Sequence, residues 1–131
     1  VVKAFLGKIG INMKVTTDGK IFKEGSVLFA VCANAPVYGG GYISAPKAVL
    51  NDGLLDCVTI DTVKRLQVPG LLPKYKSGKH ETLDVCTYGR CETFEFEADT
   101  DIPVSLDGEI IHTNKFKCEI VKNGINFVLP E

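Results

Sequence analysis

Short stretches of alternating apolar and polar residues, separated by glycine-containing turns, most limit the folds open to this chain. Asp18-Gly19 separates two strand-like segments, Ile11–Thr17 and Lys20–Lys23. A two-residue Asp-Gly turn between such segments is typical of a β-hairpin. Thr93–Glu97 alternates in the same way, with its two phenylalanines on one face. The pattern predicts antiparallel strands.

Further strands are predicted on both sides of the middle of the chain. Ser26–Cys32 is a nearly continuous apolar run, which suits a strand buried on both faces. Leu55–Asp61 alternates between apolar and polar positions. Lys115–Val121 also alternates and is followed by the turn signal Asn123-Gly124 and by Ile125–Leu129. We expect these last two segments to pair with each other.

Only Val63–Ser77 has partly helical spacing of apolar residues. Pro69 and Pro73 interrupt it, so it predicts one kinked helix or two short ones, ending at Gly78. The predicted fold class is all-β: an antiparallel β-sandwich with one short helical insertion at about residues 63–77. The length of 131 residues is typical of a single domain.

Composition narrows the functional classes. A net charge of −1 gives no argument for a nucleic-acid partner, and no apolar run reaches the ~20 residues of a membrane span. The five cysteines are odd in number and irregularly spaced, which indicates reduced, mostly buried thiols in a cytoplasmic protein. Cys86 and Cys91 do not have the spacing of a zinc site.

The tract Asn34–Asp56 has an unusual composition, with three consecutive glycines at 39–41 and little charge before its end. Glycine permits either close approach of the backbone to a neighbour or a positive φ, and we expect a ligand to approach here. Within the tract, Asp52 is either a turn residue or part of a hard-cation site, because Mg²⁺ takes carboxylate and carbonyl oxygens.

Two charged elements lie downstream of this tract. Asp107-Gly108-Glu109 is either a hairpin turn or a rigidly held general base, Glu109, with Asp107 orienting it or binding a metal. The cluster Lys74, Lys76, Lys79 and His80 is either a solvated helix end or an attractor of phosphate or an anionic membrane surface. The solvated helix end is the favoured interpretation.

Several short motifs occur together in one order along the chain. They are Asn34, Gly39-Gly40-Gly41, Ala45-Pro46, Asn51-Asp52-Gly53-Leu54-Leu55-Asp56, Gly78-Lys79-His80 and Asp107-Gly108-Glu109. Together they resemble the C-terminal domain of the bacterial diacylglycerol kinase and sphingosine-kinase-like lipid kinases, of the NAD-kinase-like superfamily. The resemblance extends from about Ile11 to Leu129.

The resemblance implies a β-sandwich that binds lipid, joined to an N-terminal nucleotide-binding domain. It implies ATP as phosphoryl donor, Mg²⁺ as cofactor and a lipid with a free hydroxyl as substrate. Glu109 would be the catalytic base, assisted by Asp107, and Asp52 would bind a structural Mg²⁺ beside the backbone carbonyls of Val49 and Leu54. It implies a cytoplasmic location, with peripheral contact at the inner membrane surface as an option.

The chain departs from the family pattern because it contains no GGDGT nucleotide motif. We therefore expect the chain to be the C-terminal part of a two-domain lipid kinase and to be inactive alone. Two alternatives remain open: a non-catalytic module that binds lipid or another small molecule, and a kinase acting on a soluble nucleotide such as NAD. A pocket lined by Phe and Leu would favour lipid, whereas base-stacking aromatics would favour nucleotide. A homodimer also remains open.

Overall fold

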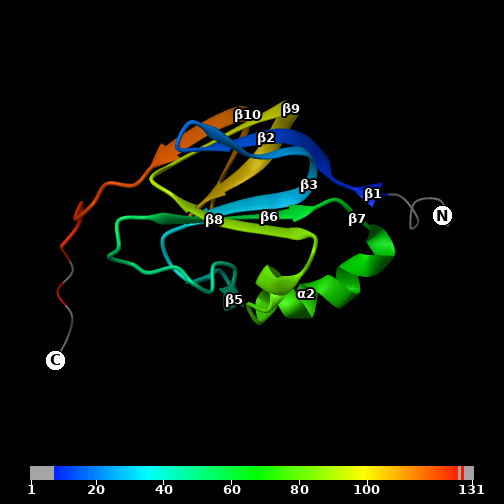
Figure 1. The fold of residues 1–131 in the computed structure, drawn as a ribbon, viewed down its shortest axis with the longest axis horizontal. Helices are drawn as coiled ribbons and strands as arrows, with labels where there is room; N and C mark the ends of the chain where they lie inside the picture. The colour runs from blue at the N-terminus through cyan, green and yellow to red at the C-terminus, as the bar shows by residue number, and fades with distance from the viewer. Residues whose placement is uncertain (1–7, 127, 129–131) are drawn as a thin grey trace.

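The computed structural model describes residues 8–126 and 128. Six strands form one antiparallel sheet in the order β10-β9-β2-β3-β6-β8, with short two-stranded pairings β1-β7 and β4-β5 beside it (Figure 1). The elements are β1 (Lys8–Ile9), β2 (Ile11–Thr17), β3 (Lys20–Ala33), β4 (Val37–Tyr38), β5 (Tyr42–Ile43), β6 (Leu55–Asp61), β7 (Val63–Lys64), the 3-10 helix η1 (Arg65–Gln67), α2 (Val68–Lys76), the 3-10 helix η2 (His80–Thr82), β8 (Cys86–Cys91), β9 (Thr93–Leu106) and β10 (Glu109–Glu119). The predicted all-β class is confirmed.

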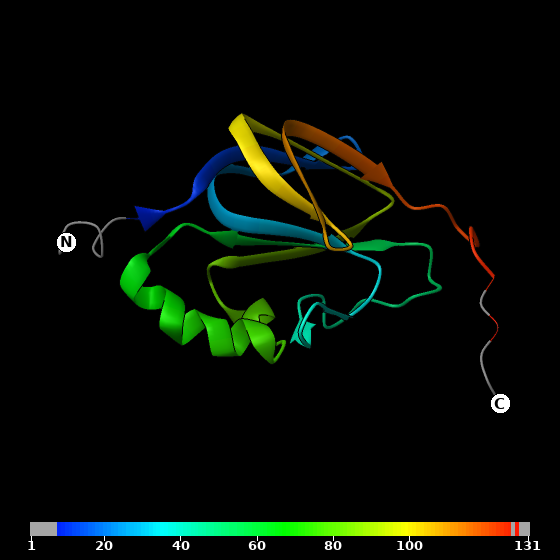
Figure 2. The same ribbon diagram turned by 180° about the vertical axis from the view of Figure 1, so that it is seen from behind.

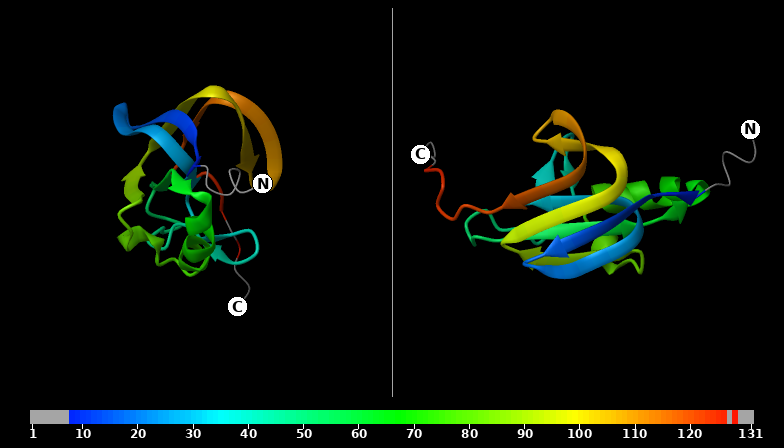
Figure 3. Two further views of the ribbon diagram at one scale, coloured as in Figure 1. Left: turned by 90° about the vertical axis from the view of Figure 1, so that its right-hand side faces the viewer. Right: turned by 90° about the horizontal axis from the view of Figure 1, so that it is seen from above.

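The sheet curls strongly, so one sheet supplies both walls of the core (Figure 3, left). The thiols of Cys32 in β3 and Cys118 in β10 lie 3.6 Å apart, although β2 and β9 separate these strands in the sheet. The fully or nearly buried core side chains come from five strands and are Met13, Val15, Val27, Leu55, Cys57, Cys91, Phe94, Phe96, Ala98 and Ile102. The apolar residues at alternate positions of β2 and β9 therefore face the core, as the sequence pattern predicted.

The β9–β10 hairpin bends sharply as it leaves the sheet (Figure 2). Glu97 pairs with Lys115 and Ile102 with Thr113, so four residues of β9 lie opposite one residue of β10. Such an irregularity bends a strand and increases its twist. Beyond it, β9 and β10 pair only with each other, up to the turn at Asp107-Gly108.

Two strand predictions need correction. The segment Lys115–Glu119 pairs with Thr93–Glu97 of β9. Of the predicted partner Ile125–Leu129, residues 125, 126 and 128 are not in a strand, and residues 127 and 129 lie outside the described residues. The Asp107-Gly108 turn folds β10 back on β9 before the later Asn-Gly turn is reached. In β3, Val27 alone of the predicted both-face-buried segment is fully buried, and the residues after it are partly buried.

The helical insertion is confirmed with narrower bounds. Residues 63–64 form β7, and a 3-10 turn then leads into α2, which tolerates Pro69 in its first turn and Pro73 further on. The predicted stop at Gly78 is confirmed, because Lys79 N–H donates to Lys74 O at 2.8 Å and Gly78 N–H to Tyr75 O at 3.1 Å. This pair of bonds is a Schellman motif, with Gly78 at φ +72°. Helix α2 lies on the side of β6 away from the β9–β10 hairpin (Figures 1 and 2).

Candidate functional site

An apolar cavity of about 60 Å³ lies between α2 and the sheet. Its lining is Leu28, Phe29, Ile60, Val68, Leu71, Leu72, Tyr75, His80 and Leu83. Val68, Leu71 and Tyr75 follow one another at helical spacing, so one face of α2 roofs the cavity. A cavity of this size and lining accepts a short hydrocarbon segment, and a longer chain requires side chains at its rim to move.

Polar groups reach this cavity at one edge. His80 is fully buried, its Nε2 lies 3.0 Å from Ser44 O, and its ring centre lies 4.7 Å from that of Tyr75. Because a carbonyl can only accept, Nε2 donates a hydrogen bond to Ser44 O, and the buried Nδ1 has no hydrogen-bond partner among the described residues. Burial, followed by a hydrogen bond with Tyr38, raises the pKa of Tyr75, so its hydroxyl stays protonated.

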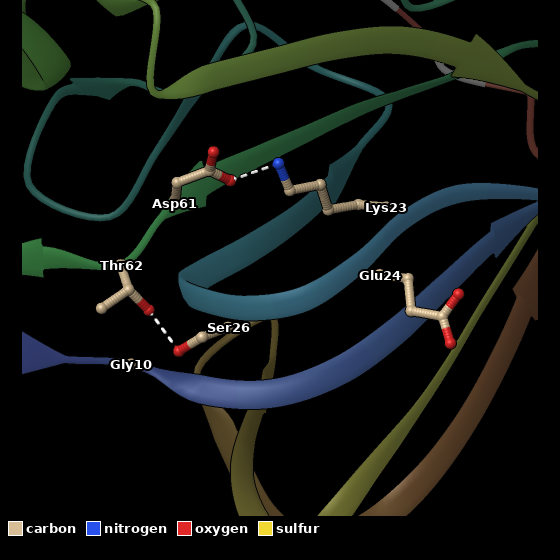
Figure 4. A pocket seen from close by; sticks show the side chains of 6 residues that line it. All are labelled: Gly10, Lys23, Glu24, Ser26, Asp61 and Thr62. Atoms are coloured by element: carbon tan, nitrogen blue, oxygen red, sulfur yellow. Dashed lines mark hydrogen bonds and ion pairs between the residues drawn. The ribbon is translucent and has the colours of Figure 1, made fainter.

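A second, polar pocket of about 390 Å³ lies where β2, β3 and β6 approach one another (Figure 4). Its lining is Gly10, Lys23, Glu24, Ser26, Asp61 and Thr62. Lys23 Nζ lies 2.6 Å from Asp61 Oδ1, and the Ser26 and Thr62 hydroxyls are hydrogen-bonded to each other (Figure 4). The lining has no aromatic ring on which a base could stack.

The triple glycine forms the turn of the small β4–β5 hairpin. Gly39, Gly40 and Gly41 have φ values of +25°, +65° and +79°. A Cβ at Gly39 or Gly41 would meet nothing within 4 Å. Of the two explanations for the glycines, the structure therefore shows the positive φ, which L-residues with a side chain rarely adopt.

The end of the same tract is held by a buried carboxylate. Asp56 is 1% exposed, accepts a hydrogen bond from the Tyr88 hydroxyl, and lies 3.1 Å from Arg90 Nε. Arg90 Nη2 also donates to Lys47 O, and Lys47 N–H donates to the Tyr88 hydroxyl at 3.2 Å. Burial and the bond to Asp56 raise the pKa of Tyr88. The network ties the loop at Lys47 to β6 and β8.

Asp52 lies in the exposed loop before β6, where its Oδ1 accepts a hydrogen bond from Leu54 N–H at 2.9 Å. This is the geometry of an Asx turn. The other carboxylate oxygen of Asp52 accepts none of the side-chain hydrogen bonds in the described part of the chain. One carboxylate together with the carbonyls of Val49 and Leu54 is a donor set of hard oxygens, which suits Mg²⁺.

Asp107 and Glu109 lie at the tip of the β9–β10 hairpin, with Asp107 at φ +49° in the turn and Glu109 as the first residue of β10. Both side chains are exposed. Among residues 8–126 and 128, no group of three or more His, Cys, Asp or Glu side chains is arranged to hold a metal ion. The described structure therefore does not assemble Asp52 with the hairpin acids into one carboxylate cluster.

A thiol cluster is a further feature that sequence spacing did not reveal. Cys57 Sγ lies 3.1 Å from Cys91 Sγ, close to the Cys32–Cys118 pair, and all five cysteines are free thiols. Burial raises the pKa of Cys91 to about 11. Cys57 and Cys91 belong to the core, and Cys32 and Cys118 pack against it, so these four protonated thiols act as small apolar groups.

No helix in the described residues has the length and apolar character needed to cross a membrane. The model of the YegS C-terminal NAD kinase beta sandwich-like domain matches residues 3–128 of the chain. The chain is 32% identical over 116 residues to a Shewanella frigidimarina protein named "Probable lipid kinase YegS-like", covering 88% of this chain and 37% of that protein. It is 33% identical over 106 residues to a Bacillus subtilis protein named "Putative lipid kinase YtlR", covering 81% of this chain and 34% of that protein.

Solved structures show the same fold. A protein of Bacillus anthracis str. Sterne described as "a putative diacylglycerol kinase" superposes with a TM-score of 0.67 at 21% sequence identity. The match covers 86% of this chain and 37% of that one. The chain thus spans little more than a third of the length of the relatives that it matches.

Proposed function

The chain belongs to the family of YegS C-terminal NAD kinase beta sandwich-like domains, and from this premise we propose that it is the lipid-substrate domain of an ATP-dependent lipid kinase. The observation that carries the proposal is the cavity under α2, whose lining of leucine, isoleucine, valine and phenylalanine suits hydrocarbon. The polar pocket offers no stacking ring, which disfavours a soluble nucleotide as the substrate of this domain.

In this proposal Glu109 accepts the proton of the lipid hydroxyl as that oxygen attacks the γ-phosphate of ATP, and Asp107 assists it. Phosphoryl transfer depends mostly on positioning and on neutralising charge. A two-strand hairpin holds Glu109 at a defined place, and its exposure lets a substrate held by a second domain reach it. The diacylglycerol type of lipid is the substrate we favour.

Asp52, with the carbonyls of Val49 and Leu54, would hold a structural Mg²⁺, which would order this loop. The ATP would bind mainly to the nucleotide-binding domain, because the 131-residue sequence contains no GGDGT motif. The proposal therefore expects the chain alone to transfer no phosphate from ATP to diacylglycerol.

The test is Glu109→Gln in a protein that joins this chain to the nucleotide-binding domain. Loss of a proton acceptor in the transition state typically lowers the rate ~10²–10⁴-fold. The matched control is Glu119→Gln at the other end of β10, which should keep wild-type turnover. Equal turnover of Glu109→Gln and wild type, with both folded by circular dichroism, would reject Glu109 as the base. Robust phosphorylation by the chain alone would reject the two-domain requirement.

A non-catalytic lipid-binding module is the second candidate, and the same apolar cavity favours it. The two candidates separate in the same experiment. A two-domain protein that binds diacylglycerol in its apolar cavity and never phosphorylates it would establish the module and reject the kinase.

A further inference from the structure

Four thiols form one contiguous cluster along the inner side of the curled sheet, and the proposed function uses none of them. Cys118 Sγ of β10 lies 3.6 Å from Cys32 Sγ of β3, and Cys57 Sγ of β6 lies 3.1 Å from Cys91 Sγ of β8. Cys32 and Cys57 are direct partners in neighbouring strands, so the two pairs adjoin. We propose that the Cys32–Cys118 pair is a redox modification site, which a small disulfide of the glutathione type converts reversibly into an intramolecular disulfide bond.

The two sulfur atoms of this pair are already in contact. A disulfide bond places its sulfurs about 2.05 Å apart, so Cys32 Sγ and Cys118 Sγ have to approach each other by roughly 1.5 Å. Strand β10 is at one edge of the sheet, and β9 and β2 separate it from β3. The contact therefore spans the curl instead of joining two neighbouring strands (Figure 3, left). A bond here would close the curl covalently.

Access from solvent distinguishes this pair from the other thiols. Cys32 and Cys118 are both partly exposed, whereas Cys57 and Cys91 are almost completely buried. A small reagent in solvent therefore has access to the first pair, and the folded core shields the second. Cys86 is also partly exposed, but neither thiol–thiol contact in the described part of the chain includes it. Cys32 and Cys118 thus combine access with a partner in contact.

Two successive thiol–disulfide exchanges form the bond, and their atoms and electrons balance. One protein thiol loses its proton to solvent, and its thiolate attacks a sulfur of the small disulfide. The S–S bond of the reagent breaks, and one small thiolate leaves and takes up a proton. The second protein thiol then loses its proton and attacks the protein sulfur of this mixed disulfide, which releases the second small thiolate. The protein pair has lost two electrons and two protons, and the reagent has become two thiols.

The surroundings of the pair slow the exchange at neutral pH. The hydrogen bond with Cys32, followed by burial, raises the pKa of Cys118 well above its usual range. The thiolate is the form that attacks a disulfide, and few molecules carry it at Cys118 near neutral pH. We therefore expect the pair to stay reduced during brief exposure to an oxidant and to respond to sustained oxidation. Transient disulfides of this kind are typical of redox sensing in a reducing compartment.

The bond would tie the entry of the glycine-rich tract to the edge strand. Cys32 is followed by Ala33, the last residue of β3, and then by the tract Asn34–Asp56, while Cys118 is next to the last residue of β10. The two cysteines are 86 positions apart in the sequence. Linking positions so far apart removes much conformational entropy from the unfolded chain, so the oxidised domain should be more stable than the reduced one.

The experiment treats the reduced 131-residue chain with oxidised glutathione at about pH 8.5, where an unperturbed thiol is half ionised. The remaining thiols are alkylated in denaturant, and mass spectrometry of peptides locates each disulfide. We expect one disulfide, Cys32–Cys118, with the other three cysteines alkylated. The oxidised chain should melt about 10 °C higher than the reduced chain, and dithiothreitol should reverse both changes.

Two variants separate this pair from general thiol reactivity. Cys118→Ala removes one partner and should abolish the rise in melting temperature on oxidation. The matched control is Cys86→Ala, which removes a partly exposed thiol outside the two pairs and should keep both the Cys32–Cys118 disulfide and the rise. Circular dichroism of the reduced chains checks their folding. If Cys118→Ala does not fold, the peptide map of the unmodified chain decides the question.

Three results would overturn the proposal. The first is that prolonged treatment leaves all five cysteines as thiols or as mixed disulfides with glutathione. The second is a main product that joins Cys57 to Cys91, or that includes Cys86, which would mean that access does not select the pair. The third is a Cys32–Cys118 disulfide without any rise in melting temperature, which would mean that the folded sheet does not accommodate the bond.

Discussion

Replacing the buried carboxylate of Asp56 tests whether the end of the glycine-rich tract is held as the structure indicates. Asp56→Ala removes the acceptor of the Tyr88 hydroxyl and the partner of Arg90, whose Nε lies 3.1 Å from Asp56 Oδ1. Breaking a buried ion pair from one side typically costs about 3–5 kcal/mol, because the remaining charge is left without its partner. The loss here should lie at the lower end, since the Arg90 side chain is 40% exposed and can regain water.

We therefore expect Asp56→Ala to lower the free energy of unfolding by about 3 kcal/mol. For a domain of this size that corresponds to a fall in melting temperature of roughly 10 °C. Asp56→Asn keeps the shape and one acceptor but loses the charge, so its loss should be smaller, about 1–2 kcal/mol. Asp84→Ala removes an exposed carboxylate and should change stability by less than about 0.5 kcal/mol.

Urea unfolding followed by circular dichroism measures these differences, with wild type, Asp56→Asn and Asp84→Ala in parallel. A second readout is local. Because Lys47 N–H donates to the Tyr88 hydroxyl and Lys47 O accepts from Arg90, amide exchange around Lys47 should accelerate in Asp56→Ala more than exchange in β2. An Asp56→Ala chain within 1 kcal/mol of wild type, with unchanged exchange at Lys47, would refute the reasoning.

Two further perturbations separate backbone and ionisation effects. Gly41→Ala should lower the free energy of unfolding by about 1 kcal/mol because Gly41 has a φ of +79°, although a Cβ there would meet nothing within 4 Å. Gly70 is equally open but lies inside α2, so Gly70→Ala should raise the free energy of unfolding by about 0.5–1 kcal/mol. Thermal unfolding measures both changes, and changes of the same sign would contradict this reasoning. Burial raises the pKa of Cys86 and of Cys91 to about 11, so the unfolded chain releases these protons first as pH rises, and stability should fall between about pH 9 and 11. Melting temperatures across this range should fall less in Cys91→Ala, and an identical slope would contradict the role of this thiol.

Local sequence signals predicted the structure correctly where it depends on one turn and the two segments that flank it. Asp18-Gly19 joins β2 to β3 as predicted, and β6 runs over Leu55–Asp61, the limits given by its alternation. Gly78 ends the helical segment because a left-handed residue after the last turn is a local requirement. These features need no information from distant parts of the chain.

Pairing between distant segments was harder to predict. Lys115–Val121 has two turn signals available, Asp107-Gly108 before it and Asn123-Gly124 after it, and its alternation fits either partner. In the structure the segment pairs through the first turn, with β9. The register of the two strands shifts at the irregularity between Glu97 and Ile102. A simple count outward from Asp107-Gly108 would therefore have found the right partner strand but the wrong opposing residues.

Buried polar groups were the least predictable part of the site. Asp56 and His80 are almost completely buried, and both depend on partners more than 30 residues away: Tyr88 and Arg90 for Asp56, and Ser44 for His80. An acid inside an apolar strand is the one signal that could have drawn attention to Asp56, since burial of a charge requires a partner. Nothing in the sequence names that partner.

The tract Asn34–Asp56 therefore contains two carboxylates with different environments. Asp56 is engaged by Tyr88 and Arg90, whereas Asp52, four residues earlier, is exposed, and within the described part of the chain its side chain accepts a hydrogen bond from Leu54 N–H of its own loop. If Asp52 holds a cation with the carbonyls of Val49 and Leu54, the position of those carbonyls depends on both ends of the loop. Arg90 and Tyr88 fix the Lys47 end and β6 fixes the Leu55 end, and Asp56 joins the two. The buried acid would then support the exposed one without touching its ligand, so Asp56→Asn should weaken Mg²⁺ binding by the chain even where the fold survives.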